Sequence, residues 1–462
     1  MFEANVYAKR RAALSAAVNE GIILLPGNTD VPFNYPANIY HFRQDSDFLY
    51  FFGHDMPGLA GVIDTEDGSE ILFGNDVDIS SIIWMGPQEL ISEKATRVGV
   101  KQIKPLAALA DVIEEAKKRG RTIHFLPPYR GESKLMLYKL LGIHPDKQKG
   151  AASVKLIKAI VDLRSIKTEM EITELEKAAE VGYEMHTTAM RMAVPGAHEQ
   201  EIAGIMEGIA LKYGGAVSFP IILSQNGETL HNHDHSQTLQ EGRMLLVDAG
   251  AEVPSRYCCD YTRTIPVGGK FTQRQREIYD IVLHANNSAF KRIKPGVTYQ
   301  EIHLHACKRI ANGLTDLGLM KGDYEEAVAA GAHALFFPHG LGHMMGLDVH
   351  DMEGLGEDYV GYDDKVKRID QFGTAYLRLG RELQSGFVLT NEPGIYFIPA
   401  LIDLWRKEKK FEQFINYDLV ETYKGFGGIR LEDDIQVTPD GCRFIGKRVP
   451  ITPEQIEEVV GR

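Results

Sequence analysis

The chain has 462 residues, of which 44% are hydrophobic and 25% are charged, as in an ordinary soluble globular protein. Its formal net charge is −13 and its basic runs are short and scattered, which argues against a nucleic-acid partner. Four cysteines are too few for a disulfide framework. No secretory signal and no apolar run of about 18 residues, as a membrane span needs, is visible. We therefore expect a cytoplasmic protein of two or three domains, with no membrane or nucleic-acid partner.

The first third of the chain has the pattern of a small α/β domain. Apolar runs broken by Gly, Pro and Asp predict strands, and amphipathic stretches predict helices: strands at 21–27 and 60–64, and helices at 1–20, 106–118 and 132–142. We expect this domain to cover residues 1–155 and a second domain to cover residues 156–462. The segment around 148–166 is the expected bridge between them.

The second domain combines well-marked helices with strands. Three Thr-x-x-Glu/Gln capping boxes predict helix starts: Thr168 with Glu171, Thr272 with Gln275, and Thr298 with Glu301. Strand-like segments follow at 243–253, 257–267, 387–398 and 428–438. This order predicts an α+β domain with helices packed on one face of an antiparallel sheet. The polar, Gly-rich segment 352–385 predicts an inserted surface loop or subdomain.

Two aspartates lie in the predicted hairpin. Asp248 ends an apolar strand and shares a face with Leu246 and Met244. By itself such an Asp is more often a turn residue. Asp260 follows in a β-branched and aromatic strand, where an unpaired buried carboxylate would be costly. Two strands joined by a short turn would place both aspartates side by side, and like charges that close need a cation between them.

The segment His339-Gly-Leu-Gly-His343 supplies a candidate imidazole ligand. Its glycines, and the lack of a Glu after the first His, disfavour the helix of a zinc protease. They predict instead a backbone that bends closely around a site. Further along, Pro393 forces Glu392 into an extended conformation and removes a donor from the ladder.

The last motif is a strand in which the period of two puts Arg430, Glu432 and Asp434 on one face. Any one of these motifs is more often an ordinary strand or a surface charge than a ligand. Their combination reverses that judgement. Two Asp and two Glu carry a charge of −4, which two divalent cations would neutralise. Four carboxylates and one imidazole form a hard, oxygen-rich set that favours Mn²⁺ or Co²⁺, with Zn²⁺ or Fe²⁺ as alternatives. Two such ions together can activate water and stabilise an oxyanion.

The settings of these ligands resemble a known family. They read, in order, VDAGAE, DYTRT, HGLGH, NEPG and GIRLEDD, and resemble the proline-specific branch of the pita-bread metallopeptidases, the aminopeptidase P and prolidase family. Residues 42–53 resemble the N-terminal domain of aminopeptidase P, and residues 268–283 are similar to the bacterial enzyme. The resemblance implies a C-terminal pita-bread (creatinase/aminopeptidase) domain and an N-terminal α/β domain. It also implies peptide substrates with proline in second position, and a homodimer or homotetramer.

The resemblance also implies roles for the metal ligands. Asp248 and Glu392 would each bind one metal ion, Asp260 and Glu432 would bridge both ions, and His343 would be the only imidazole ligand. Glu392 or Glu432 would handle the proton.

Four further side chains would act on the substrate or support the site. His231 would contact the substrate, and His339 and His350 would stabilise the tetrahedral intermediate and bind the substrate. Arg430 would support the ligands or bind substrate. His233 and His235 are expected in a solvated loop.

Two features differ from a short bacterial aminopeptidase P. Cys258-Cys259 replaces small residues in a loop one residue longer than usual, and we expect these thiols to be core residues, with oxidation as the alternative. The segments 352–385 and 400–426 resemble prolidase. Within the first, Arg378 matches the arginine by which prolidases hold a dipeptide's C-terminal carboxylate, although a surface arginine beside Arg381 would look the same.

Four functions remain to be compared. The leading expectation is a Xaa-Pro aminopeptidase, and the alternative is a Xaa-Pro dipeptidase. A non-catalytic binding protein, or a metal-free creatine hydrolase, would show substitutions among the five ligands. All five are present here, which disfavours those readings.

Overall fold

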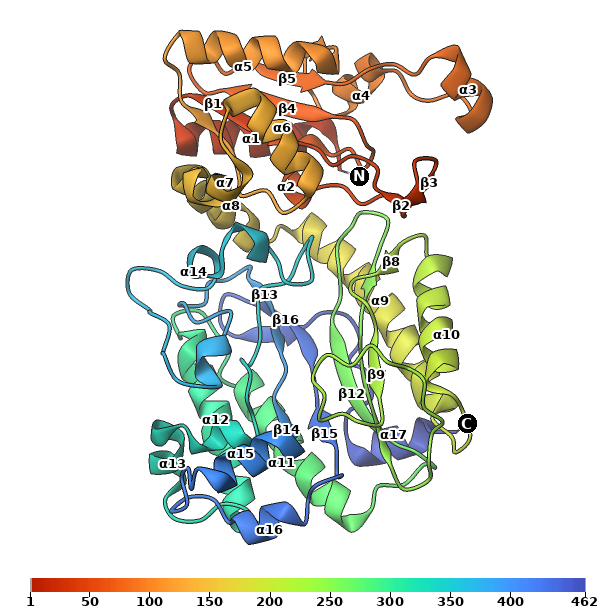
Figure 1. Cartoon of the computed structure of the whole chain (residues 1–462), viewed down its shortest axis with the longest axis vertical. Coiled ribbons are helices and arrows are strands. Elements are labelled where there is room, and N and C mark those ends of the chain that lie inside the picture. Colours follow the sequence, from red (N-terminus) through yellow and green to blue (C-terminus); the bar gives the residue numbers. More distant parts are fainter. Residues whose placement is uncertain (1, 462) are drawn as a thin grey trace. The chain divides into compact units, whose positions relative to one another are not determined.

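The computed structural model describes residues 2–461, and Figure 1 shows its elements in chain order. The chain divides into two units, Met1–Arg164 and Ser165–Arg462. The expected boundary at 155/156 falls near the start of helix α8 (Val154–Ser165), which runs up to the division. In the described part of the chain, no helix is both long and apolar enough to cross a membrane.

The first unit is built on a five-stranded mixed sheet with the order β6-β5-β4-β1-β7. Strands β1, β4 and β5 pair antiparallel, whereas β7 and β6 join the two edges in parallel. The strands are β1 (Ile22–Pro26), β4 (Ala60–Asp64), β5 (Glu70–Phe73), β6 (Gln102–Lys104) and β7 (Ile123–His124), and a separate hairpin contains β2 (Pro32–Tyr35) and β3 (Asn38–Ile39). The strands expected at 21–27 and 60–64 are therefore confirmed.

Eight helices and one 3₁₀ turn are described in this unit. They are α1 (Ala4–Val18), α2 (Ser46–Phe52), α3 (Ile79–Met85), α4 (Ile91–Arg97), α5 (Leu109–Lys118) after the 3₁₀ turn η1 (Leu106–Ala108), α6 (Gly131–Leu141), α7 (Pro145–Ala151) and α8. The three helices expected here are confirmed, but the buried face of α1 is not purely apolar. Its buried face includes Arg10 and Arg11. Arg11 donates to the carbonyl oxygens of Phe51 and Val98 and pairs with Glu70, so its charge is satisfied inside the unit.

The second unit contains two three-stranded antiparallel sheets, with the orders β12-β10-β9 and β13-β16-β17. They comprise β9 (Ile222–Ser224), β10 (Met244–Ala249), β12 (Tyr261–Pro266), β13 (Val388–Asn391), β16 (Asp433–Val437) and β17 (Cys442–Phe444). Two short pairs complete the unit: β8 (Ala216–Val217) with β11 (Ala251–Glu252), and β14 (Gly394–Tyr396) with β15 (Gly428–Arg430).

Each of the four long strands expected in this unit is present but shorter or interrupted. The breaks fall at Gly250, at Glu392-Pro393 and at Leu431-Glu432. At Gly250 a Cβ atom would lie 1.8 Å from the carbonyl oxygen of Cys259, so only glycine fits. Pro393 has no backbone N–H, so the sheet lacks one hydrogen-bond donor at this position. These breaks place carboxylate-bearing residues at strand ends, where they are released from regular pairing.

Helices cover the sheets of the second unit. Figure 1 shows α9 (Glu169–Met192) and α10 (Glu199–Lys212) beside β9 and β12, with α11 (Gln273–Phe290) and α12 (Tyr299–Asp316) on the side of β14 and β15. The capping boxes predicted for α9, α11 and α12 are all confirmed. The remaining helical elements are α13 (Tyr324–Ala330), η2 (Ala332–Leu335), α15 (Pro399–Lys407), α16 (Tyr417–Glu421) and α17 (Pro453–Val459).

The segment 352–385 is only partly the surface loop that its composition predicts. It forms the short turns η3 (Glu353–Leu355), α14 (Glu357–Val360) and η4 (Thr374–Tyr376). Tyr362, Leu377 and Leu379 within it are buried. The expectation was therefore wrong for this apolar part, since its side chains belong to the core, and the segment also contributes to the cavity described below.

Candidate metal centre

The candidate site lies where the two three-stranded sheets of the second unit meet. An isolated antiparallel bridge between Thr262 and Glu432 joins them there. Asp248 lies in β10 opposite Thr262, and Asp260 directly precedes β12 rather than lying within it as expected. Glu392 directly follows β13, and Glu432 occupies the break between β15 and β16. The four carboxylates are thus held by strand ends on both sides of one junction.

The junction brings the five predicted ligands together. Ligand atoms of Asp260, His343 and Glu432 all lie within 4.8 Å of one another. The Nε2 atom of His343 is 3.4 Å from Oδ2 of Asp260 and 3.8 Å from Oε1 of Glu392. Asp248 completes the group from the paired strand, and its charge acts directly on Asp260. Residues that are as much as 184 positions apart in the sequence therefore share one small volume.

The carboxylates strongly oppose one another's ionisation. Burial, followed by the charges of neighbouring carboxylates, raises the pKa of Asp260 and of Glu432 well above the usual range. Burial first, then Asp260 and Asp248, raise the pKa of Glu392 to about 8 against the charge of Arg430. The Oδ1 atoms of Asp248 and Asp260 are buried and have no hydrogen-bond partner among residues 2–461. Buried, unpartnered carboxylate oxygens fit divalent cations, which prefer such hard donors.

His343 is oriented as a ligand. Its Nδ1 lies 3.0 Å from the carbonyl oxygen of Met344, to which it can donate a hydrogen, so the lone pair is left on Nε2, which faces the carboxylates. Burial lowers the pKa of His343 to about 4, so the ring is neutral at physiological pH. The glycines around it serve close packing. A Cβ atom at Gly342 would lie 2.2 Å from the carbonyl oxygen of Thr390.

The predicted face of the last strand is present. Arg430 donates from Nε to the hydroxyl of Thr262, and that hydroxyl donates to Oε2 of Glu432 at 2.7 Å. Asp434 accepts a hydrogen bond from the backbone amide of Asp260. All three side chains thus contact the segment that carries the second aspartate, as the period of two predicts.

Arg430 also begins a hydrogen-bonded chain that the sequence analysis missed. Its Nη2 contacts Oδ2 of Asp248 at 2.6 Å, and its Nη1 donates to the hydroxyl of Tyr396 at 2.9 Å. The Tyr396 hydroxyl lies 2.8 Å from Nε2 of His339, whose Nδ1 lies 2.8 Å from the carbonyl oxygen of Gly340. Both ring nitrogens of His339 are therefore engaged within the protein. The sequence could have indicated Tyr396, because it lies four residues after Glu392 in a predicted strand. An even separation puts both side chains on the same face of a strand.

A cavity of about 430 Å³ opens beside the carboxylates. Polar residues line one part of it, including the predicted substrate residues His231, His339, His350 and Arg378. The ring of His350 lies against that of His343 in a tilted arrangement, with centroids 4.0 Å apart, and His231 is exposed. Apolar side chains line another part: Phe219, Pro220, Ile222, Leu230, Pro338, Val349 and Tyr376. His233, expected in a solvated loop, is exposed but also lines the cavity.

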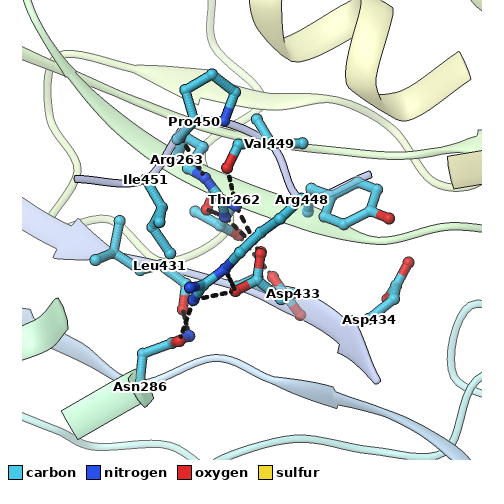
Figure 2. Close-up of polar contacts among 12 residues, drawn as sticks. Thr262, Arg263, Asn286, Leu431, Asp433, Asp434, Arg448, Val449, Pro450 and Ile451 are labelled. Carbon is cyan, nitrogen blue, oxygen red and sulfur yellow. Dashed lines mark hydrogen bonds and ion pairs between the residues drawn. The ribbon is translucent and has the colours of Figure 1, made fainter. Parts of the chain in front are cut away.

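Behind the carboxylates, a buried ion network fixes the strand that carries Glu432 (Figure 2). Asp433 pairs with Arg263 at 2.6 Å and with Arg448 at 2.8 Å. Although burial raises the pKa of Asp433, the two guanidinium groups outweigh it and leave that pKa below its usual value. Arg263 also donates to the carbonyl oxygen of Glu432 at 2.6 Å. The network therefore holds the backbone of a predicted ligand from its far side.

Asn286, on α11, connects both glutamate segments. Its Nδ2 donates to the carbonyl oxygens of Asn391 at 3.0 Å and of Leu431 at 3.1 Å, the residues directly before Glu392 and Glu432. Asn391 returns a hydrogen bond to the backbone of Asn286. One buried amide thus ties together the two segments from which the glutamates emerge. Figure 2 shows Asn286 beside Leu431.

Cys258 and Cys259 are buried, and neither forms a disulfide bond within residues 2–461. Burial raises the pKa of the Cys259 thiol well above its usual range, so this thiol is protonated and unreactive. The structure thus places these cysteines in the core, as expected.

Comparison with known proteins agrees with this geometry. Residues 173–439 match metallopeptidase family M24, and residues 7–124 match the aminopeptidase P N-terminal domain. The chain is 32% identical to the Xaa-Pro dipeptidase of Homo sapiens, covering 97% of this chain and 90% of that protein. It is 31% identical to a probable Xaa-Pro aminopeptidase of Paracoccidioides brasiliensis (strain Pb18), covering 99% of this chain and 97% of the relative.

Solved structures agree in fold. A variant of Escherichia coli aminopeptidase P in complex with substrate superposes with a TM-score of 0.81 at 29% identity, covering 99% of this chain and 98% of the other. The structure of Pseudomonas aeruginosa aminopeptidase PepP has a TM-score of 0.82 at 28% identity, with the same coverage. The chain has the α+β architecture of these proteins, an N-terminal domain followed by a pita-bread domain. It belongs to metallopeptidase family M24, in the branch that contains aminopeptidase P and prolidase.

Proposed function

We propose that this protein is a dinuclear metal-dependent exopeptidase that hydrolyses the Xaa-Pro bond at peptide N-termini. The observation that carries the proposal is the junction of three buried carboxylates, the partly exposed carboxylate of Glu392 and one neutral imidazole beside an open cavity. Among residues 2–461, two of the carboxylate oxygens have no hydrogen-bond partner. The relatives named as Xaa-Pro peptidases support the bond specificity.

Two divalent ions, Mn²⁺ in our proposal, would be held by Asp248, Asp260, His343, Glu392 and Glu432. When bound, they would supply Lewis acidity for activating water and for stabilising the oxyanion. The charge of the four carboxylates supports two ions rather than one, because a single ion would leave the buried cluster with a net charge of −2.

Glu392 is the proposed proton carrier. Its side chain is 17% exposed, compared with 6% for Asp260 and 10% for Asp248. One of its carboxylate oxygens can therefore face the cavity and a water molecule while the other contacts the cluster. In this position Glu392 can accept a proton from attacking water and donate it to the departing proline nitrogen.

The cavity walls suit an Xaa-Pro substrate. The apolar part, packed on the buried cluster of Ile222, Leu246 and Tyr396, offers a surface for the pyrrolidine ring or for an apolar first residue. A proline-preceding bond has no N–H to donate, so recognition depends on shape and on the substrate's other polar groups. We propose that His231 and His350 contact those groups, whereas His339 is held by Tyr396 and acts through that bond.

A Xaa-Pro dipeptidase is the second candidate, because the positively charged side chain of Arg378 lines the cavity. The Arg378 side chain is 35% exposed and lines the cavity, where it can meet the C-terminal carboxylate of a dipeptide. The 32% identity to the human dipeptidase supports this candidate. A non-catalytic role is disfavoured because all five ligand positions are intact and converge.

The deciding experiment measures kcat/KM after metal removal and Mn²⁺ addition, on Xaa-Pro, Xaa-Pro-Xaa and matched Xaa-Ala-Xaa peptides. We expect Mn²⁺-dependent cleavage of both proline peptides and little cleavage of the alanine peptide. Cleavage of dipeptides alone would favour the dipeptidase. Less than one bound metal ion per two chains, together with no cleavage, would refute the proposal that the protein is an enzyme.

We also propose a cytoplasmic homodimer or homotetramer. The family resemblance supports the oligomer, and light scattering of the purified protein would test it. A monomer at micromolar concentration would contradict it.

A further inference from the structure

The guanidinium of Arg378 is already paired with the protein's own carboxylates. Its Nε lies 3.2 Å from Oε2 of Glu353 and 3.9 Å from Oε1 of Glu357. All three side chains are 35% exposed, so the pairs do not lie in the core. Arg378 lines the cavity, whereas Glu353 and Glu357 line a small adjoining pocket together with Arg378 and His350. The positive charge that Arg378 presents to the cavity is therefore compensated before any substrate binds.

Glu353 also contacts His350. The same Oε2 atom that meets Arg378 accepts a short hydrogen bond from Nδ1 of His350. Burial acts to raise the pKa of Glu353, but the hydrogen bond and charge of His350 and the charge of Arg378 outweigh it and lower that pKa to about 2. Glu353 is thus an anion at any pH at which a peptidase would work, and it joins two residues of the cavity.

Arg378 acts on the whole site. Its charge contributes, after the larger effect of burial, to the lowered pKa of His231, His339 and His343. It also opposes the raised pKa of Glu392.

Dipeptides and longer peptides differ in the charge they bring to this wall. A Xaa-Pro dipeptide carries a carboxylate directly after proline, whereas a longer peptide carries a neutral amide there. An uncompensated arginine would attract the carboxylate. Glu353 is the nearer carboxylate to Arg378, whereas Glu357 pairs more closely with Arg368, at 2.8 Å. The carboxylate of a dipeptide would therefore meet a guanidinium that Glu353 already compensates, and like charges at short range repel.

We propose that Glu353 is a specificity-determining residue that disfavours dipeptides relative to longer Xaa-Pro peptides by compensating Arg378. The proposal rests on the peptidase function proposed above and specifies its substrate class. It accounts for how a chain that has the cavity arginine expected of a dipeptidase can still act as an aminopeptidase.

The test is Glu353→Gln in the full-length Mn²⁺ enzyme. Glutamine keeps an oxygen that can accept from Arg378 and His350 but removes the charge. We expect the ratio of kcat/KM for Xaa-Pro to that for Xaa-Pro-Xaa to rise about tenfold, mainly through a lower KM for the dipeptide. In a Glu353→Gln, Arg378→Ala double variant the rise should disappear.

Asp358→Asn is the matched control. Asp358 lies on α14, next to Glu357, its side chain is 80% exposed, and it pairs with Arg368. In Asp358→Asn, the ratio of kcat/KM for Xaa-Pro to that for Xaa-Pro-Xaa should stay at the wild-type value. Glu357→Gln should move the ratio in the same direction as Glu353→Gln but less, because its distance from Arg378 is longer. This variant also serves as the test if thermal unfolding shows that Glu353→Gln does not fold.

An unchanged ratio in both glutamine variants would overturn the proposal. Equal loss on both substrates in Glu353→Gln would also overturn it and would leave Glu353 as a support for His350. Failure of the wild-type enzyme on both proline peptides is a different result, because it would refute the proposed function itself.

Discussion

Replacing Asn286 by alanine should uncouple the two glutamate-bearing strands. The side chain is fully buried, and it donates to the carbonyl oxygens of Asn391 and Leu431. Each buried carbonyl left without this donor costs about 1–3 kcal/mol, so we expect the free energy of unfolding of the second unit to fall by about 2–6 kcal/mol. Because Glu392 and Glu432 directly follow those carbonyls, we also expect Mn²⁺ affinity to fall about 10- to 100-fold.

The control is Asn287→Ala on the same helix. Asn287 is half-buried, and its Oδ1 accepts a hydrogen bond from Arg448 at 3.1 Å. Loss of this hydrogen bond should lower the free energy of unfolding by about 0.5–1.5 kcal/mol and leave Mn²⁺ affinity unchanged. Thermal unfolding of metal-free protein and isothermal titration with Mn²⁺ measure the two effects. If Asn286→Ala matched Asn287→Ala in both, the claim that Asn286 sets the position of the glutamates would be wrong.

Three further outcomes are expected. Asp260→Ala should lower kcat/KM by at least about 10³-fold while circular dichroism stays unchanged, since a proposed metal ligand is lost. Tyr396→Phe should lower kcat/KM about tenfold and the free energy of unfolding by about 1 kcal/mol, because His339 and Arg430 lose their shared hydroxyl. In metal-free protein, the melting temperature should fall as the pH rises from about 6.5 to 8.5, and Mn²⁺ or Glu392→Gln should reduce that fall.

The sign of the pH effect follows from the raised pKa of Glu392, which burial and the neighbouring carboxylates place at about 8. The folded protein keeps a proton that the unfolded chain releases near pH 4.5. This contribution to stability is full below the unfolded value and is lost as the pH rises through about 8. Above pH 6.5 the lowered histidine pKa values no longer oppose it. A melting temperature that rises over this window would contradict the carboxylate cluster.

Near-normal turnover by Asp260→Ala would refute the proposal that this residue holds a metal ion. For Tyr396→Phe, wild-type kinetics would show that His339 keeps its orientation without the hydroxyl. Both measurements need wild-type levels of folded protein, which thermal unfolding checks.

Local patterns were enough to predict most elements and the residues that gather at the site. The capping boxes at Thr168, Thr272 and Thr298 depend only on neighbouring residues, so the helix starts were predictable. The alternation of Arg430, Glu432 and Asp434 likewise follows from strand geometry alone. The choice of a hard metal follows from residue types, which are a property of the sequence.

The tertiary structure alone decided which side chains meet. Arg11 is charged, so its burial in α1 could not be predicted without the carbonyl groups and the glutamate that satisfy it. The pairing of Arg378 with Glu353 joins residues within a segment that has little regular structure and no period to read. Long-range contacts of this kind depend on how strands and turns close in space, whereas sequence periodicity reports only the geometry of one element at a time.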